Sequence, residues 1–230
     1  MEECKKDQIL VPMTCEQHEW FMQLMEQHRK GTSKKLEETK EKFNKLINGL
    51  KESGELIDLL LEDVKSSLSI YSERRDDQFM RRNFVRTFFA AIEGHIYRMK
   101  QDAILYHEHE NEQQIFKPEE VNLLKEKSYE DKVDKQGKAN RKEKDTYISF
   151  LPNFRFSIEC YIKSLKLNYN FDFSSNGWEC LQKTVEIRNN ITHPKSVSNM
   201  KIEDSDMEKV NTAFNWYIDN MKKLLSSRSS

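Results

Sequence analysis

The chain contains few residues that favour tight turns, with only 6 glycines and 4 prolines among 230 residues. A sandwich or barrel of many short strands needs turn formers at each reversal of the chain. Long stretches of this sequence instead place apolar residues three and four positions apart, which is the period of an amphipathic helix. Charged residues make up 33% of the chain and can solvate broad outer faces, while 13 Phe, 8 Tyr and 3 Trp can build a core. We therefore predict an all-α protein.

The charge balance and the cysteines limit the possible function classes. Lys and Arg number 38 against 39 Asp and Glu, so bulk charge does not indicate a nucleic-acid-binding protein, although a local basic face is compatible with the sequence. No apolar run approaches the ~18 residues of a membrane span, and residues 1–6 lack the apolar core of a secretory signal. Cys4, Cys15, Cys160 and Cys180 have neither C-x-x-C nor metal-ligand spacing. We expect reduced thiols in a cytoplasmic protein, with no membrane segment, no cofactor and no metal centre.

Residues 1–72 are predicted to form a helical N-terminal extension. Apolar residues recur with a helical period over 14–30, 33–52 and 55–73. We expect breaks between these helices at residues 31–33, which begin with a glycine, and at residues 53–54, a Ser-Gly pair. The extension would then be a helical hairpin or an extended arm, and the polar run 72–77 would end it.

Residues 77–226 are predicted to form an antiparallel four-helix bundle. Each expected helix has an apolar face, and several have a recognisable start or stop signal: proline in a first turn, proline after a last turn, or a capping box. The first expected helix covers 77–108, and a second helical unit comprises a short helix from Pro118 to about Lys127 and a helix over 152–167. The third helix runs from Ser174 or Ser175 to Pro194, and the fourth from the capping box Ser205–Glu208 to about 226.

Residues 128–145 differ from the rest of this region. They include six Lys or Arg residues and few apolar ones, and Gly137 lies in the middle. A segment of this composition cannot bury much apolar surface. We expect a mobile basic loop, which is either a solvated surface feature or a strip that follows a phosphate backbone.

One short segment, Glu186 to Pro194, combines side chains that suit metal-free RNA cleavage. In that reaction a 2′-hydroxyl attacks the adjacent phosphorus, and an imidazole such as that of His193 can take or give the proton. A fork-shaped, permanently charged guanidinium such as that of Arg188 suits the extra negative charge of the phosphorane. The amide of Asn189 can orient either group.

The spacing of this segment has a geometric consequence. Five helical residues turn about 500° and rise ~7.5 Å, so Arg188 and His193 would not converge on one phosphate from an intact helix. Either His193 leaves the helix ahead of Pro194 and swings back towards Arg188, or two protomers each contribute one Arg188 and one His193 to a shared cleft, which predicts a homodimer. A purely structural alternative stays open, with Arg188 in a salt bridge and His193 capping the helix.

The segment resembles the signature of the HEPN superfamily, an Arg followed after four to six residues by a His, usually with a polar residue directly after the Arg. The motif Arg188-Asn189-Asn190-Ile191-Thr192-His193 lies at the end of the third of four expected helices, and Phe84–Ile96 is similar to the family's first helix. The resemblance covers residues 77–226. It implies a four-helix bundle, a homodimer and a metal-independent endoribonuclease of toxin–antitoxin or other defence systems, with Arg188, Asn189 and His193 at the site. RNA and an antitoxin or defence-system protein would be the partners.

The alternative to an enzyme is a non-catalytic helical module that binds RNA, a nucleotide or another protein.

Further features are compatible with either function. Glu93 is expected to face Arg188, either as an acidic helper or as the group that holds the guanidinium, and His95 follows it closely. His107 and His109 lie two residues apart, which is a poor metal-ligand spacing on a helix. Phe171 and Phe173 are interpreted as core residues in preference to base-stacking ones.

Overall fold

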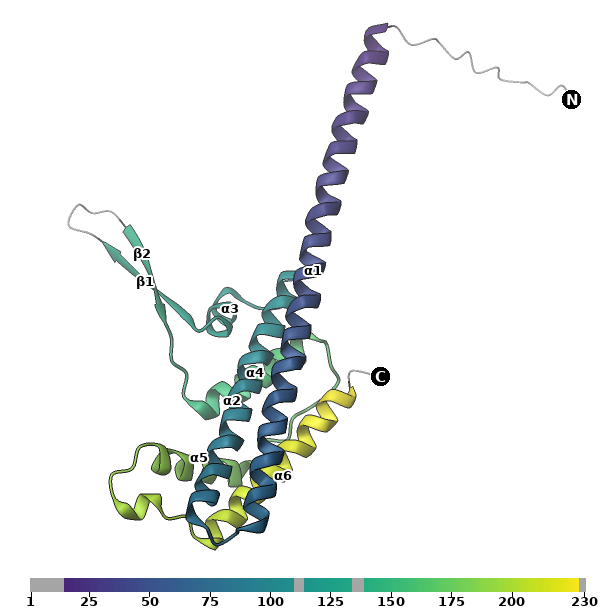
Figure 1. The fold of residues 1–230 in the computed structure, drawn as a ribbon. Helices are drawn as coiled ribbons and strands as arrows, with labels where there is room; N and C mark the ends of the chain where they lie inside the picture. Colours follow the sequence, from purple (N-terminus) through teal and green to yellow (C-terminus); the bar gives the residue numbers. More distant parts are fainter. Residues whose placement is uncertain (1–14, 110–113, 134–138, 228–230) are drawn as a thin grey trace, which may run out of the picture. The chain divides into compact units, whose positions relative to one another are not determined.

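The computed structural model describes residues 15–109, 114–133 and 139–227, which fall into a unit of residues 1–45 and a second unit of residues 46–230. The described chain is mostly helical, as predicted (Figure 1). None of its helices combines the length and apolar character needed to cross a bilayer. The elements are α1 (Cys15–Glu73), α2 (Gln78–His109), α3 (Pro118–Leu124), β1 (Lys127–Val133), β2 (Ala139–Asp145), α4 (Phe150–Ser164), α5 (Asn176–Thr192), the 3-10 helix η1 (Val197–Met200) and α6 (Asp204–Ser226).

In the first unit, the described residues form the N-terminal part of α1. The helix runs through Gly31 without a break, so the expected interruption at residues 31–33 is wrong. A single glycine costs a helix only about 1 kcal/mol, and neighbouring ion pairs support this stretch. Glu26 accepts a hydrogen bond of 3.0 Å from Arg29 Nε, and its carboxylate lies 3.5 Å from Lys30 Nζ.

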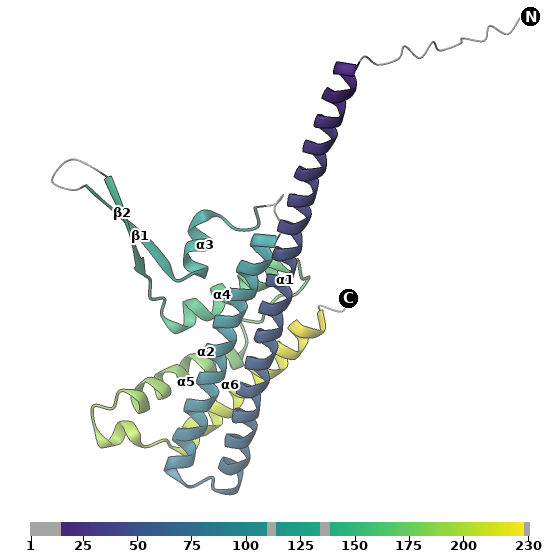
Figure 2. The ribbon, with the colours of Figure 1, turned by 45° about the horizontal axis from the view of Figure 1, so that its top comes forward.

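In the second unit, the remainder of α1 and α2 form a helical hairpin through the turn at residues 74–77, close to the predicted boundary (Figure 2). The expected break at Ser53 and Gly54 is wrong, because α1 is helical there. Small residues at this level allow a close approach to α2. Ser53 is buried and donates to Asp102 Oδ2 at 3.2 Å, and the Gly49 carbonyl accepts from Arg98 Nη2 at 2.7 Å.

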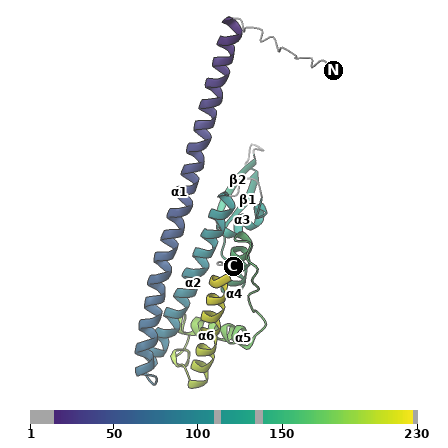
Figure 3. The same cartoon turned by 90° about the vertical axis from the view of Figure 1, so that its right-hand side faces the viewer.

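Helix α2 is the central element of the second unit. It packs against α3, α4, α5 and α6, and in Figure 3 it stands between residues 46–73 of α1 and helices α4 and α5. Its aromatic residues form the middle of the core, where Phe88 lies 5.3 Å from Phe214 and 5.9 Å from Tyr217 between ring centroids. The fully buried large side chains of this unit are Phe84, Phe88, Phe89, Lys100, Phe116, Phe154, Ile92, Leu124, Ile158, Leu181, Ile191 and Ile202.

The segment expected to be a mobile basic loop is a β-hairpin, so that prediction is wrong. Strands β1 and β2 pair antiparallel from Lys127 opposite Asp145 to Val133 opposite Ala139. The strands are stabilised by charge in place of apolar burial, since Lys127 Nζ lies 2.9 Å from Glu143 and 2.8 Å from Asp145. These two carboxylates hold the pKa of Lys127 above its usual range. The central residues 134–138, including two of the basic residues counted above, lie outside the described part.

The last helix begins earlier than its expected start. Helix α6 starts at Asp204, and its capping box joins Glu203 and Asp206 in place of Ser205 and Glu208. Glu203 N donates to Asp206 Oδ2 at 3.4 Å. Ile202, which precedes the N-cap residue Glu203, is held by contacts from α2 that are described below.

Candidate functional site

The candidate catalytic residues lie at the C-terminal end of α5. The helix ends at Thr192, one residue before His193, which has φ −125° and ψ 62°. Pro194 disfavours the helical conformation of the residue before it. The backbone N–H of His193 still donates to Asn189 O at 2.9 Å. His193 therefore leaves the helix ahead of Pro194. This is only the first half of the single-chain solution, which also requires the imidazole to turn back towards Arg188.

Arg188 is held firmly against α2 and the start of α4. Its Nη2 pairs with Glu93 Oε1, as the sequence suggested. Its guanidinium carbon lies 5.2 Å from the ring centroid of Phe89 and 5.6 Å from that of Phe150, which is the range of a cation–π contact. The side chain retains 20% of its exposure. The ion pair and the two rings fix the direction of the guanidinium, and part of the side chain stays at the surface.

The other two candidate residues are both exposed. Asn189 Oδ1 accepts a hydrogen bond of 3.1 Å from Arg188 Nη1, so this pair is brought together. Among the described residues, none forms a hydrogen bond or ion pair with the imidazole of His193. Within one chain, therefore, Arg188 and Asn189 form a contact pair, and His193 is not joined to them by a side-chain hydrogen bond.

A row of arginines on α2 holds the end of α5 and the connection that follows it, and sequence reasoning missed these contacts. Arg86 Nη2 donates to Ile191 O and Arg82 Nη1 donates to Met200 O, both at 2.8 Å. Arg81 Nη1 donates to Ile202 O at 2.8 Å. The only signal for these contacts in the sequence was the presence of cations on an aromatic-rich helix.

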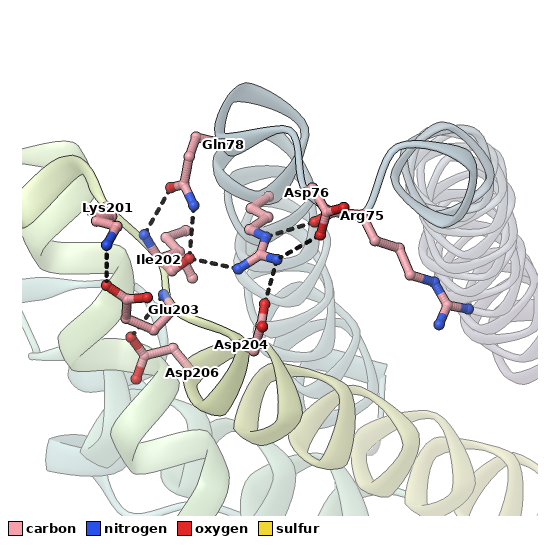
Figure 4. A network of polar contacts seen from close by, with 9 residues as sticks. Arg75, Asp76, Gln78, Lys201, Ile202, Glu203, Asp204 and Asp206 are labelled. Carbon is pink, nitrogen blue, oxygen red and sulfur yellow. Dashed lines mark hydrogen bonds and ion pairs between the residues drawn. The ribbon is translucent and has the colours of Figure 1, made fainter.

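Most of the hydrogen bonds that hold this connection belong to a polar network around Ile202 (Figure 4). Gln78 donates to Ile202 O and accepts from Ile202 N, each at 2.9 Å. Arg81 also donates through Nε to Arg75 O at 2.6 Å and through Nη2 to Asp204 Oδ1 at 2.5 Å. The backbone on the far side of His193 is thus anchored to the first turns of α2.

A second titratable pair lies in the core. His95 Nδ1 and the Tyr217 hydroxyl share a hydrogen bond, and His95 Nε2 has no partner among the described residues. Burial lowers the pKa of His95 to about 4 and raises the pKa of Tyr217. Both groups are therefore neutral near pH 7. His95 lies two residues from Glu93, about 200° around the helix, and so faces away from Arg188.

The remaining candidate residues pack against other aromatic side chains. Phe171 is buried, with its ring centroid 5.4 Å from that of Trp216. Phe173 is partly buried and packs edge to face on Trp178 at 5.1 Å, so both belong to the core as interpreted. The His107 ring packs on Phe116 at 5.5 Å. In the described part of the chain, no group of three or more His, Cys, Asp or Glu side chains is placed to hold a metal ion.

Burial is the main influence on the pKa of the Cys160 thiol. The Cys160 thiol is buried, and this burial, more than the nearby Glu120, raises its pKa to about 12. Cys160 and Cys180 are both free thiols.

Comparisons with known protein families, with curated proteins and with solved structures find no match to this chain.

Proposed function

We propose that this protein is a metal-independent endoribonuclease of the HEPN type, in which α2, α4, α5 and α6 correspond to the family's four-helix bundle. The observation that carries the proposal is the arrangement of Arg188 and His193 at the end of α5. Arg188 is oriented by Glu93 with part of its side chain at the surface, and His193 is exposed and lies outside the helix. These are the two groups that such a reaction needs.

The proposed mechanism assigns one role to each side chain. His193 accepts the proton of the attacking 2′-hydroxyl or donates one to the leaving 5′-oxygen, since an imidazole titrates close to neutral pH. Arg188 stabilises the charge of the phosphorane, and Asn189 orients the phosphate through its amide. The products are a 2′,3′-cyclic phosphate and a 5′-hydroxyl. The biological setting that the resemblance implies is a cytoplasmic toxin or defence effector, paired with an antitoxin or another defence protein.

The first test uses purified full-length protein and end-labelled single-stranded RNA in the presence of EDTA. We expect cleavage by the wild type and a loss of about 100-fold or more in His193→Ala and Arg188→Ala. Removal of an acid–base group typically costs about 10²–10⁴-fold, and removal of one group that stabilises developing charge costs about 10²–10³-fold. Arg155→Ala is a matched control, since Arg155 also pairs with a carboxylate, Glu159, and lies 5.0 Å from an aromatic ring, that of Phe173.

The control variant should cleave like the wild type, and circular dichroism should show that all variants stay folded. Absence of cleavage by the wild type would refute the proposal. So would equal cleavage by the wild type and the two motif variants.

We further propose that the complete site forms across a homodimer, because one chain does not join His193 to Arg188. Mixing the inactive variants Arg188→Ala and His193→Ala tests this directly. In a mixed dimer, one of the two shared sites would combine an intact Arg188 from one protomer with an intact His193 from the other. We expect a substantial part of the activity to return after subunit exchange. A mixture as inactive as its components would show that each site uses a single chain.

The second candidate function is a non-catalytic helical module that binds RNA, a nucleotide or another protein. The ion pair between Arg188 and Glu93 favours it, because a guanidinium neutralised by a carboxylate and packed on two rings is also a common structural arrangement. In that case Arg188→Ala would lower the midpoint of thermal unfolding and His193→Ala would have no effect on any measured activity.

A further inference from the structure

A cavity of about 360 Å³ lies in the second unit between residues 46–73 of α1, α2 and α6. This volume falls within the ~300–1,000 Å³ typical of small-molecule sites. The wall is formed mainly by apolar side chains from the three helices. They include Ile57, Leu61 and Val64 of α1, Met99 of α2, and Phe214 and Ile218 of α6.

The wall also contains a buried nitrogen atom that has no hydrogen-bond partner among the described residues. His95 lines the cavity, is 6% exposed, and has an Nε2 atom that finds no hydrogen-bond partner among the described residues. Buried polar atoms in folded proteins are nearly always hydrogen-bonded. This nitrogen is therefore a hydrogen-bonding position on an otherwise largely apolar wall.

The charged side chains around the cavity are predominantly positive. Arg98 is matched by a carboxylate, since its Nη2 lies 3.9 Å from Asp102 Oδ1. Lys65 and Lys222 also line the cavity and are exposed. No described carboxylate lies within ion-pair distance of either lysine. The cavity therefore has an apolar interior with two unmatched cations at its exposed edge.

We propose that this cavity binds an amphiphilic carboxylate of the medium-chain fatty-acid class, with its alkyl chain among the apolar side chains and its carboxylate at Lys65 and Lys222. The volume favours a single chain over a protein segment, because a helix with its side chains is ~10–12 Å wide and would not fit a full turn in this space. Arg188, Asn189 and His193 do not line the cavity. The proposal is thus independent of the proposed nuclease.

The test is isothermal titration calorimetry of the full-length protein with octanoate, decanoate and decanol, each below its micelle concentration. Each added methylene should tighten binding by about fourfold, so decanoate should bind about 15-fold more tightly than octanoate. Lys65→Gln combined with Lys222→Gln should weaken decanoate by about tenfold, as two exposed ion pairs would, and leave decanol unchanged. Lys223→Gln is the matched control, since Lys223 is the adjacent α6 lysine and does not line the cavity.

Two further variants test the location of the ligand. Ile218→Phe and Leu61→Phe each add volume to the cavity from a different helix, and both should abolish binding of decanoate. Thermal unfolding shows whether each variant is folded, and one folded variant is sufficient. The proposal is overturned if the wild type does not bind decanoate, if a folded filled variant binds it as well as the wild type, or if the lysine substitutions affect decanoate and decanol equally.

Discussion

The free energy of unfolding should fall by about 3 kcal/mol as the pH is lowered from 7.5 to below 4, through His95 alone. Burial lowers the pKa of this imidazole from its usual 6.5 to about 4 in the folded state. Between these two values the unfolded chain binds a proton that the folded chain does not bind. Stability is therefore complete above about pH 6.5, decreases as the pH falls towards 4, and changes no further below that value. Each pKa unit corresponds to about 1.4 kcal/mol.

Urea unfolding at pH 7.5 and pH 5 measures most of this change, about 2 kcal/mol. His95→Gln should remove that share of the pH dependence and keep a polar partner for the Tyr217 hydroxyl. His193→Gln is the matched control, because His193 is exposed and lies at the surface of the same unit. Carboxylates that titrate in this range affect all three proteins equally and cancel in the comparison. An unchanged pH dependence in His95→Gln would show that His95 is not a buried neutral group.

The helices of this protein could be predicted from sequence because their signals are local. An apolar period of three and four residues specifies α2 and α6, and Pro194 specifies where α5 ends. One of the two wrongly expected breaks lies where a local signal has a tertiary role. Ser53 weakens α1 as an isolated helix, yet it is buried and donates to Asp102 of α2. Gly31 and Gly54 have no such neighbour in the described part of the chain, and the helix simply continues through them.

The β-hairpin was missed for a related reason. Its strands carry almost no apolar alternation, and the pairing of Lys127 with Glu143 and Asp145 is visible only once the register is known. The candidate site shows the same limit. Its motif could be read along the chain, and Glu93 could be inferred from helix position. The hydrogen bond between His95 and Tyr217 joins residues 122 positions apart and has no sequence signature.

Replacement of Arg81 by methionine should destabilise the protein by about 3 kcal/mol. The side chain is only 7% exposed, and its guanidinium donates to two backbone carbonyls and to Asp204. Hydrogen bonds from a charged group contribute about 1.5–3 kcal/mol each. Taking a cation out of water has a free-energy cost, and the variant without the buried cation avoids this cost. This gain offsets part of the free energy lost with the hydrogen bonds. Methionine keeps much of the apolar stem of arginine, so the loss reports mainly on the polar contacts.

The neighbouring variant Arg82→Met is the control for this prediction. Arg82 lies on the same helix, and its hydrogen bond, to Met200 O, is to the same connection. Its removal should cost about 1.5 kcal/mol, the lower end of the range for one hydrogen bond from a charged group, because Arg82 is only half-buried. If urea unfolding gave the same decrease in the free energy of unfolding for both variants, the additional hydrogen bonds of the network around Ile202 would not add to stability.

The same pair of variants connects the fold to the proposed site. The backbone between His193 and α6 is anchored at Ile202 by Arg81 and Gln78, so Arg81→Met should increase hydrogen exchange at the Ile202 amide, which donates to Gln78 Oε1 at 2.9 Å. Arg188 is fixed separately by Glu93 and should keep its position. If the proposed ribonuclease site depends on where His193 is held, Arg81→Met should lower the cleavage rate under conditions in which the protein is still fully folded. An unchanged rate in the folded variant would show that the anchor at Ile202 serves stability alone.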